Sequence, residues 1–183
     1  YSQKNSVPLL ARGGGSSQCG QTVGESVVLD YSKHQNKILE LNVEEKYVWV
    51  QPGVVLDHLN AYLKPHGLWF PVDVSTSSRA TIGGMSANNS CGSRSLYYGN
   101  MVHNVLAIEA ILDDGSIFNF DQINKNYLAT KNNQDRLYKI IDKFIDVRQK
   151  VGSEIDANWP TTQRRVGGYN IDLIDPEGFN SSN

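Results

Sequence analysis

Short apolar runs between polar segments predict that the first part of the chain forms strands. The runs at 7–11 and 27–30 are brief and bounded by polar residues or glycines, which favours two buried strands. Two further runs, at 38–41 and 47–50, flank a polar stretch, so this region predicts a β-hairpin. The first fifty residues therefore indicate strands rather than helices.

The spacing of apolar residues changes from residue 54 onward. One face of a helix is predicted by Val55, Leu59, Tyr62 and Leu63, and Gly67 is a suitable stop. The later runs 105–112 and 117–120 flank an Asp-Asp-Gly turn signal and predict a second hairpin. The polar segment 124–134 predicts a loop. A second amphipathic helix follows, with its buried stripe predicted at Leu137, Ile140, Ile141, Phe144 and Val151.

Two polar loops that contain glycines interrupt this pattern. The first reads RGGGSS at 12–17; its three glycines can adopt positive φ and let a ligand approach the main chain. Successive amides in such a turn form an anion-binding nest, to which serine hydroxyls and an arginine add phosphate-binding groups. The second loop, 71–92, is rich in hydroxyls and too poor in apolar residues for a core, and long unstructured loops are usually functional or disordered. A tight surface turn would explain the first loop alone, whereas the presence of the second loop favours a cradle for a diphosphate.

Composition and charge narrow the class of protein. The chain has 183 residues, of which 39% are hydrophobic and 20% charged, with a net charge of −2, as is usual for a globular protein. Lysines and arginines are dispersed, so no nucleic-acid partner is predicted. No apolar run reaches the length of a membrane span, and no signal segment is visible.

The two cysteines, Cys19 and Cys91, are far apart and lack metal-ligand spacing, so no metal site is predicted. Unclustered cysteines fit a reducing compartment. We therefore expect a cytoplasmic location, with peripheral attachment to a membrane left open. Because the chain starts at Tyr1 and stops in the polar sequence PEGFNSSN, we expect it to be a piece of a longer polypeptide.

Several motifs follow one another in a fixed order: RGGGSS, VQPGVVLDHLN at 50–60, PVDVSTSSRATIGG at 71–84, NNSCG at 88–92 and YGNMVHNVLAIEAILDDG at 98–115. Together they resemble the PCMH-type FAD-binding domain of the vanillyl-alcohol oxidase and p-cresol methylhydroxylase superfamily. Within it, the chain is most similar to the branch of D-lactate dehydrogenases, the glycolate oxidase flavin subunit and D-2-hydroxyglutarate dehydrogenases. The resemblance covers roughly residues 7–120 and resumes at EIDANWPTTQRRVGGYNIDLI.

The resemblance implies an α+β fold with two lobes. FAD would be held between a small α/β lobe and a larger lobe of mainly antiparallel strands with flanking helices. We expect residues 1–175 to form a partial FAD-binding domain, with 1–70 in the first lobe and 71–175 in the second. Residues 176–183 would be a polar tail or the start of a linker to a missing substrate domain.

Carried over by position, the resemblance implies four groups of FAD contacts. The pyrophosphate would be wrapped by Arg12, Gly13, Gly14, Gly15, Ser16, Ser17, Gly20 and Gln21. The diphosphate, the ribityl chain and part of the isoalloxazine would be lined by Pro71, Asp73, Ser75, Thr76, Thr81, Ile82, Gly83 and Gly84. The flavin ring would be approached by Asn89, Ser90, Gly92 and Ser93, and the adenine side by Tyr98, Gly99 and Val105. Glycines permit close approach, hydroxyls satisfy phosphate and ribityl oxygens, and the main chain donates to ring atoms.

The sequence departs from the family pattern in three places. Ser16 and Ser17 stand where many relatives that bond FAD covalently carry a histidine, so we expect dissociable, non-covalent FAD. His103 stands where relatives often have an aspartate, which leaves that contact open. The Ser-Glu-Gly-Thr type segment that closes the flavin site is absent from this sequence, as are the leading helix and strand, the substrate-binding cap and any metal-bearing C-terminal part.

The reaction implied by the resemblance oxidises a small 2-hydroxy acid of the D-lactate, glycolate or D-2-hydroxyglutarate type to a 2-oxo acid. The α-hydrogen would pass as hydride to flavin N5 while a base takes the hydroxyl proton. The sequence identifies no base. Surface roles are favoured for His34, His58 and His66, and His103 is the histidine nearest to a flavin motif. We expect the chain by itself to be inactive.

Arg164 and Arg165 suggest recognition of a carboxylate, although a solvated basic pair beside a turn explains them slightly better. The tryptophans are interpreted as packing residues. Two other functions stay open: a non-redox domain that binds another phosphorylated ligand, and an FAD-dependent reductase of the cell-wall precursor type. A kinase-like P-loop is disfavoured, because the first loop lacks a Gly-Lys-Ser/Thr ending.

Overall fold

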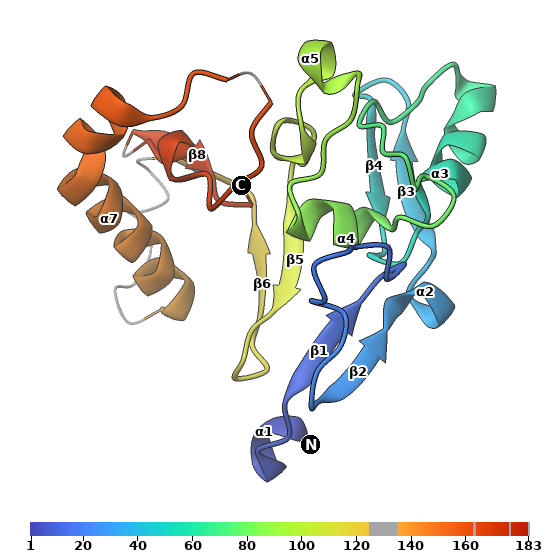
Figure 1. Cartoon of the computed structure of the whole chain (residues 1–183), viewed down its shortest axis with the longest axis horizontal. Helices are drawn as coiled ribbons and strands as arrows, with labels where there is room; N and C mark the ends of the chain where they lie inside the picture. The colour runs from blue at the N-terminus through green and yellow to red at the C-terminus, as the bar shows by residue number, and fades with distance from the viewer. Residues whose placement is uncertain (125–134, 163, 176, 183) are drawn as a thin grey trace. The chain divides into compact units, whose positions relative to one another are not determined.

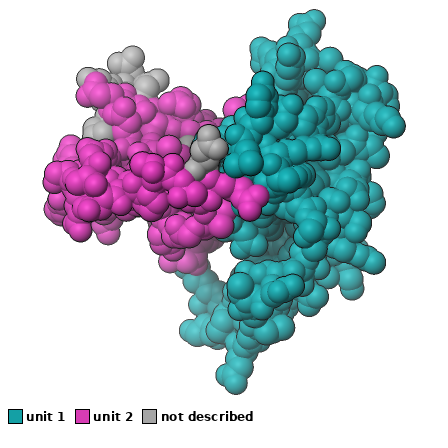
Figure 2. All heavy atoms as spheres, turned by 45° about the horizontal axis from the view of Figure 1, so that its top comes forward, with its two compact units in different colours: residues 1–104 teal, residues 105–183 magenta. Residues whose placement is uncertain are grey.

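The computed structural model describes residues 1–124, 135–162, 164–175 and 177–182. The chain divides into two compact units, Tyr1–Asn104 and Val105–Asn183 (Figure 2). The predicted lobes divide the sequence earlier, after residue 70. In the structure, hydrogen bonds from Leu56 N to Ala80 O (3.0 Å) and from Ile82 N to Val54 O (2.8 Å) hold the segment after residue 70 in the first unit. The lobe assignment stays a prediction for the complete domain.

The first unit begins with a parallel pair of strands (Figure 1). After helix α1 (Ser2–Asn5), strand β1 (Leu9–Arg12) pairs with β2 (Val27–Asp30), and α2 (Tyr31–His34) follows directly. Both strands lie where the apolar runs predicted them, but the prediction that they are buried was wrong, because every residue of β2 is exposed. In the part of the chain that the structure describes, this sheet has two strands, so each strand keeps one unpaired edge.

An antiparallel hairpin and a helix form the core of the first unit. Strands β3 (Ile38–Asn42) and β4 (Tyr47–Val50) pair as predicted, and helix α3 (Leu56–Leu63) follows. The 3-10 turn η1 (Lys64–His66) extends α3 and ends at Gly67, whose φ is 70°. The buried residues Val54, Leu59 and Leu63 pack against partly buried residues of the hairpin and its neighbours, namely Ile38, Leu41, Val48, Val50, Leu68, Phe70 and Ile82. The predicted hairpin and helix are therefore confirmed.

The long polar segment after residue 70 contains helices that the sequence did not predict. Helix α4 spans Ile82–Ala87, α5 spans Ser95–Tyr98, and the 3-10 turn η2 spans Met101–His103. Helix α4 starts at Thr81, which is 1% exposed and whose hydroxyl accepts the N–H of Gly84 (3.4 Å). An isolated bridge between Val55 and Thr81 holds this start beside the first turn of α3. The expectation of an unstructured loop across 71–92 was therefore wrong for residues 82–87.

The second unit consists of two antiparallel strand pairs and one long helix. Strand β5 (Ile108–Ile111) pairs with β6 (Ile117–Phe120), which confirms the second predicted hairpin. Strand β7 (Gln122–Asn124) pairs with β8 (Gly178–Asn180). Helix α7 (Arg136–Asn158) is followed by the 3-10 turn η3 (Ile171–Leu173). Apart from Asn124, the last residue of β7, the loop predicted at 124–134 lies outside the described residues. The mixture of helices and mostly antiparallel strands confirms the predicted α+β class.

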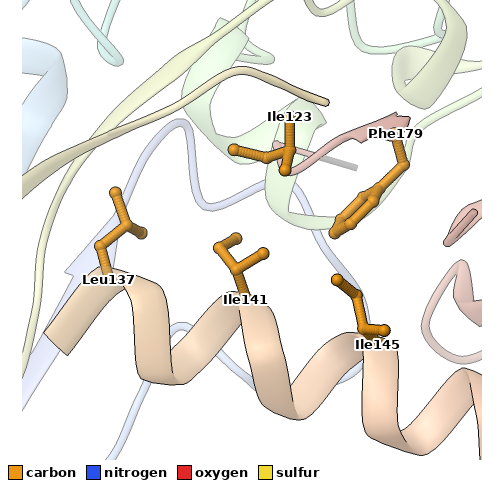
Figure 3. Packing of buried hydrophobic residues seen from close by; sticks show 5 residues of the cluster. All are labelled: Ile123, Leu137, Ile141, Ile145 and Phe179. Carbon is orange, nitrogen blue, oxygen red and sulfur yellow. The ribbon is translucent and has the colours of Figure 1, made fainter. Parts of the chain in front are cut away.

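The core of the second unit forms where α7 packs against β7 and β8 (Figure 3). Its buried side chains are Ile123, Leu137, Ile141, Ile145 and Phe179. The predicted stripe was right for Leu137 and Ile141 but wrong for Phe144, which is 37% exposed. Residues 176–183 were expected to be a polar tail or linker; instead Phe179 pairs with Ile123 across the β7–β8 ladder and is buried.

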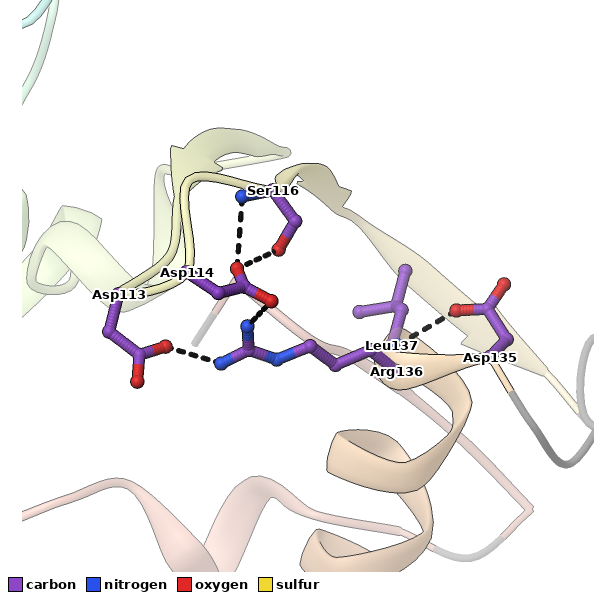
Figure 4. Close-up of polar contacts among 6 residues, drawn as sticks. All are labelled: Asp113, Asp114, Ser116, Asp135, Arg136 and Leu137. Atoms are coloured by element: carbon purple, nitrogen blue, oxygen red, sulfur yellow. Dashed lines mark hydrogen bonds and ion pairs between the residues drawn. The ribbon is translucent and has the colours of Figure 1, made fainter. Parts of the chain in front are cut away.

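An arginine at the start of α7 binds the turn between β5 and β6 (Figure 4). The guanidinium of Arg136 forms ion pairs with Asp113 and Asp114. Asp114 also accepts the backbone N–H of Ser116 (2.9 Å), and Asp135 caps the helix by accepting the N–H of Leu137 (2.8 Å). These contacts fix the first turn of α7 to the hairpin.

Candidate FAD-binding site

The glycine loop after β1 lies directly against the segment that leads into α4. A Cβ atom added to Gly13 would overlap the hydroxyl oxygen of Thr81, and one added to Gly14 would lie 2.9 Å from the carbonyl carbon of Arg79. All four residues belong to the first compact unit. The two loops that the sequence predicts to hold one cofactor are therefore adjacent in the structure.

The glycines of the first loop have different roles from those predicted. Only Gly15 of the three adopts positive φ (65°). The guanidinium of Arg12 packs against it, and Nη2 of Arg12 lies 2.6 Å from the position of a Cβ atom on Gly15. Gly13 and Gly14 instead leave room for the second loop. The sequence allows positive φ at all three glycines, but of the three Gly15 alone adopts it, and Gly13 and Gly14 serve close packing between the loops.

Several main-chain donors of the first loop have no partner within the described residues. The N–H groups of Gly14, Gly15, Ser16 and Ser17 donate no hydrogen bond there. Gly15 lies against the Arg12 guanidinium, and the two serines add hydroxyls. Successive amides with a neighbouring cation suit a diphosphate, so these residues fit the phosphate part of FAD.

Farther along this loop, Gly20 is exposed with φ at 76°, and its carbonyl accepts the N–H of Val23 (3.3 Å). Gln21 is also exposed. Their predicted contacts with the pyrophosphate stay predictions.

The donors at the start of α4 are already used. Ile82 N–H bonds to the carbonyl of Val54 and Gly83 N–H to the carbonyl of Pro52, each at 2.8 Å. A Cβ atom on Gly83 would lie 2.5 Å from Cβ of Pro52, so this glycine also permits close packing. The Gly84 N–H bonds to the hydroxyl of Thr81. Since all three N–H groups are used in this way, any contact of Ile82, Gly83 or Gly84 with FAD would come from other atoms.

Asp73 joins the start of the second loop to the turn before α5. Its Oδ1 accepts the backbone N–H of Arg94 (2.9 Å), and its Oδ2 accepts the hydroxyl of Ser93 (2.7 Å). Partial burial alone would raise the pKa of Asp73, but the hydrogen bonds from Ser93 and Arg94 hold it below its ordinary value of 3.8. Pro71 is half-buried, and Ser75 and Thr76 are exposed on the following turn.

The predicted ring-facing residues lie in a tightly bonded segment. Asn89 adopts positive φ (44°), and its side-chain oxygen accepts the N–H of Val102 (3.0 Å). Ser90 donates its N–H to Met85 (2.9 Å) and accepts the N–H of Met101 (3.0 Å). These bonds shape residues 88–102, and the predicted contacts of this segment with the flavin ring stay predictions.

His103 has a structural role next to Gly99. Its Nδ1 accepts the N–H of Asn100 (3.0 Å) and lies 2.7 Å from the position of a Cβ atom on Gly99, whose φ is 79°. Tyr98 contacts the Trp69 ring edge-on, with ring centroids 5.1 Å apart. Val105 belongs to the second compact unit, where its carbonyl accepts Nδ2 of Asn180 (3.2 Å), so its predicted contact with FAD stays a prediction.

The remaining candidate side chains lie elsewhere. His34, His58 and His66 are exposed. In the second unit, Arg165 forms an ion pair with Asp172 and stacks over the Trp159 ring at 5.3 Å.

Two residues that contact the predicted site were missed by sequence reasoning. Gly14 contacts the main chain of Arg79, and Gly83 contacts ring and main-chain atoms of Pro52. The sequence gives no signal for either contact.

Among the described helices, none combines the length and the apolar character needed to cross a membrane.

Comparison with known proteins agrees with this geometry. A family model described as "FAD binding domain" matches residues 1–121. A D-2-hydroxyglutarate dehydrogenase of Haemophilus influenzae is 46% identical over 173 residues, which is 91% of this chain and 17% of that protein. A mitochondrial D-lactate dehydrogenase [cytochrome] of Kluyveromyces lactis is 42% identical over 118 residues, which is 62% of this chain and 20% of that protein.

A solved structure supports the fold. The 6-hydroxy-D-nicotine oxidase of Arthrobacter nicotinovorans matches with a TM-score of 0.58 at 18% identity, covering 65% of this chain and 26% of that one. The chain thus spans 17% of the length of its D-2-hydroxyglutarate dehydrogenase relative from Haemophilus influenzae. Because the family model matches residues 1–121 and the two glycine-bearing loops are adjacent, the chain belongs to the FAD binding domain family, and its cofactor is FAD.

Proposed function

We propose that the chain is the flavin-binding part of an FAD-dependent dehydrogenase that oxidises a 2-hydroxy acid to a 2-oxo acid. Among the three substrate types expected from the sequence, D-2-hydroxyglutarate is the best supported. The alignment with a dehydrogenase of that name covers 91% of this chain, whereas the alignment with a D-lactate dehydrogenase covers 62%.

One observation carries this proposal: the amides of residues 14–17, which donate no hydrogen bond within the described residues, lie in a loop that packs against Arg79 and Thr81. The four N–H groups and the Arg12 guanidinium would bind the diphosphate of FAD. Because Gly13 and Gly14 hold this loop against the segment before α4, the diphosphate would be fixed relative to the second loop.

FAD, when bound, supplies the acceptor for the hydride that leaves the α-carbon of the substrate. The described residues supply no evident base for the hydroxyl proton. His103 uses Nδ1 to accept the N–H of Asn100, which favours a structural role. We therefore propose that the base and the groups that bind the substrate carboxylate come from parts of the polypeptide outside this chain, and that the chain alone is inactive.

We further propose that FAD is held without a covalent bond, since serines occupy positions 16 and 17 and the stretch 12–26 contains no histidine. Precipitating the yellow protein with acid tests this: the flavin should stay in the supernatant. Flavin retained in the pellet would contradict it.

We also propose a cytoplasmic location. The alternative is peripheral attachment to a membrane, and cell fractionation would distinguish the two. The two free cysteines support a reducing compartment.

Two measurements test the main proposal. Titration of the purified chain with FAD, followed by quenching of flavin fluorescence, should show saturable binding, with FMN and ADP as comparison ligands. The polypeptide that carries this chain should then reduce an artificial electron acceptor with D-2-hydroxyglutarate faster than with D-lactate or glycolate. Binding of ADP without any preference for FAD would favour the non-redox alternative. A requirement for a pyridine nucleotide as electron donor would favour the reductase.

A further inference from the structure

Two segments that are both expected to touch FAD are joined through the side chain of Asp73. One segment contains Asp73 itself, and the other is the turn that precedes α5. Both carboxylate oxygens are engaged: Oδ1 accepts the backbone N–H of Arg94 (2.9 Å), and Oδ2 accepts the hydroxyl of Ser93 (2.7 Å). The carboxylate therefore bonds to the opposite segment with both oxygens.

The junction leaves no room for a side chain at Gly92. A Cβ atom there would overlap the carbonyl oxygen of Asp73 and lie 2.5 Å from its carbonyl carbon. Gly92 N–H also donates to the hydroxyl of Ser95 (3.0 Å), and Ser95 is 3% exposed. Val72, which precedes Asp73 in the chain, is fully buried. The turn is thus packed onto the main chain around Asp73.

A second contact joins the same two segments a few residues away. The guanidinium of Arg94 lies over the ring of Trp69, 5.0 Å from the ring centroid, and the Tyr98 ring meets Trp69 edge-on. Residues 69–73 and 92–98 are therefore held together at both ends, by the Asp73 carboxylate and by the contacts of Trp69 with Arg94 and Tyr98. We name this pair of contacts the Asp73 clamp.

Resting on the proposed function, we propose that Asp73 is a positioning residue for FAD. Its carboxylate holds the turn 92–94 against residues 71–73, so that both segments present their main chain to the cofactor in one fixed arrangement. The carboxylate does not itself bind FAD. This assigns Asp73 a role different from the direct contact that its position in the motif implies, and the bonds of its two oxygens to Ser93 and Arg94 are the observations that favour the new role.

The test compares four variants of the 183-residue chain in FAD titrations: Asp73→Ala, Asp73→Asn, Ser93→Ala and the double variant Asp73→Ala/Ser93→Ala. Asp73→Ala should raise the Kd for FAD about ten-fold or more, since it removes two hydrogen bonds to a charged group. Asp73→Asn should recover most of the affinity, because its side-chain oxygen can accept from Arg94 and its amide can donate to Ser93. The double variant should bind no worse than Asp73→Ala, as expected for two residues of one contact.

The absorbance spectrum of bound FAD separates positioning from direct contact. At saturating FAD, the bound-flavin spectrum of Asp73→Ala should match that of the parent, because no group next to the cofactor has been removed. Asp57→Ala, which removes an exposed carboxylate from α3, is the matched control and should leave the Kd unchanged. If Asp73→Ala does not fold, Ser93→Ala decides: a higher Kd with an unchanged spectrum supports the clamp, and a parental Kd overturns it.

Two results would overturn the inference while leaving the proposed function intact. Asp73→Ala could bind FAD as tightly as the parent. Alternatively, Asp73→Asn could bind as weakly as Asp73→Ala with an altered bound-flavin spectrum, which would show direct contact. Failure of the parent chain to bind FAD would overturn the proposed function instead, and the inference with it.

Discussion

Gly13 lies so close to Thr81 that a Cβ atom on Gly13 would overlap the Thr81 hydroxyl oxygen. Thr81 is 1% exposed, so its side chain has little space to rotate away. Gly13→Ala should therefore separate the two loops or strain them, lowering the free energy of unfolding by roughly 1–3 kcal/mol and weakening FAD binding. Denaturant unfolding and an FAD titration measure the two effects.

The matched control is Gly24→Ala. A Cβ atom there would have only the hydroxyl of Ser26 nearby, at 3.8 Å, and Gly24 does not have a left-handed φ. This variant should unfold and bind FAD as the parent does. Equal behaviour of Gly13→Ala and Gly24→Ala would show that the loops do not pack as described.

Thr81 also begins helix α4, since its hydroxyl accepts the N–H of Gly84. Thr81→Val keeps the size of the side chain but removes the cap, and should lower stability by about 1 kcal/mol. Thr81→Ser keeps the hydroxyl and should retain more of the stability. Thermal unfolding of the two variants measures the difference. A Val variant more stable than the Ser variant would mean that packing of the methyl groups outweighs the cap.

The parts of the fold that could be predicted are those specified by local sequence. The hairpins around 42–46 and 113–115 combine short apolar runs with turn residues, and their strands pair as expected. Helix α3 followed from the spacing of Leu59 and Leu63. The proposal that the first loop binds a diphosphate also rests on local sequence, because glycines, serines and an arginine in one run have few structural uses besides anion binding or a tight turn.

The parts that could not be predicted depend on contacts between distant residues. Strand β8 is three residues long and exists because Phe179 pairs with Ile123. Helix α4 lies in a polar segment and is held by bonds from Ile82 and Gly83 to Val54 and Pro52. The roles of Gly13 and Gly14 likewise became clear only when their neighbours in space were known.

Ile141 is fully buried where α7 packs on β7 and β8 (Figure 3). Ile141→Ala should lower the free energy of unfolding by about 2–5 kcal/mol, because the surrounding side chains fill a cavity only partly. Val147→Ala on the same helix is the control: Val147 is 44% exposed, and its truncation should cost much less. Similar losses for both variants would contradict the assigned face of α7.

Arg136 should make the stability of the second unit depend on acidity. The hydrogen bond from Arg136 and its charge lower the pKa of Asp113 below its ordinary value of 3.8 (Figure 4). A carboxylate with a lowered pKa stabilises the fold fully above its unfolded pKa, and that stabilisation is lost as pH falls through the lower folded pKa. Arg136→Met should therefore lower the unfolding midpoint by a constant amount between about pH 5 and 7, and by progressively less at pH values below 3.8.

The size of this effect should be small, because Asp113 is 88% exposed and water screens the pair. Lys139→Met provides the control, since it removes a cation from the same helix at an exposed position where the structure shows no ion pair within the described residues. Subtracting the unfolding midpoint of Lys139→Met from that of Arg136→Met at each pH isolates the contribution of the ion pairs with the two aspartates. A difference that persists unchanged at the acid end would show that Arg136 stabilises α7 by packing of its side chain rather than by its charge.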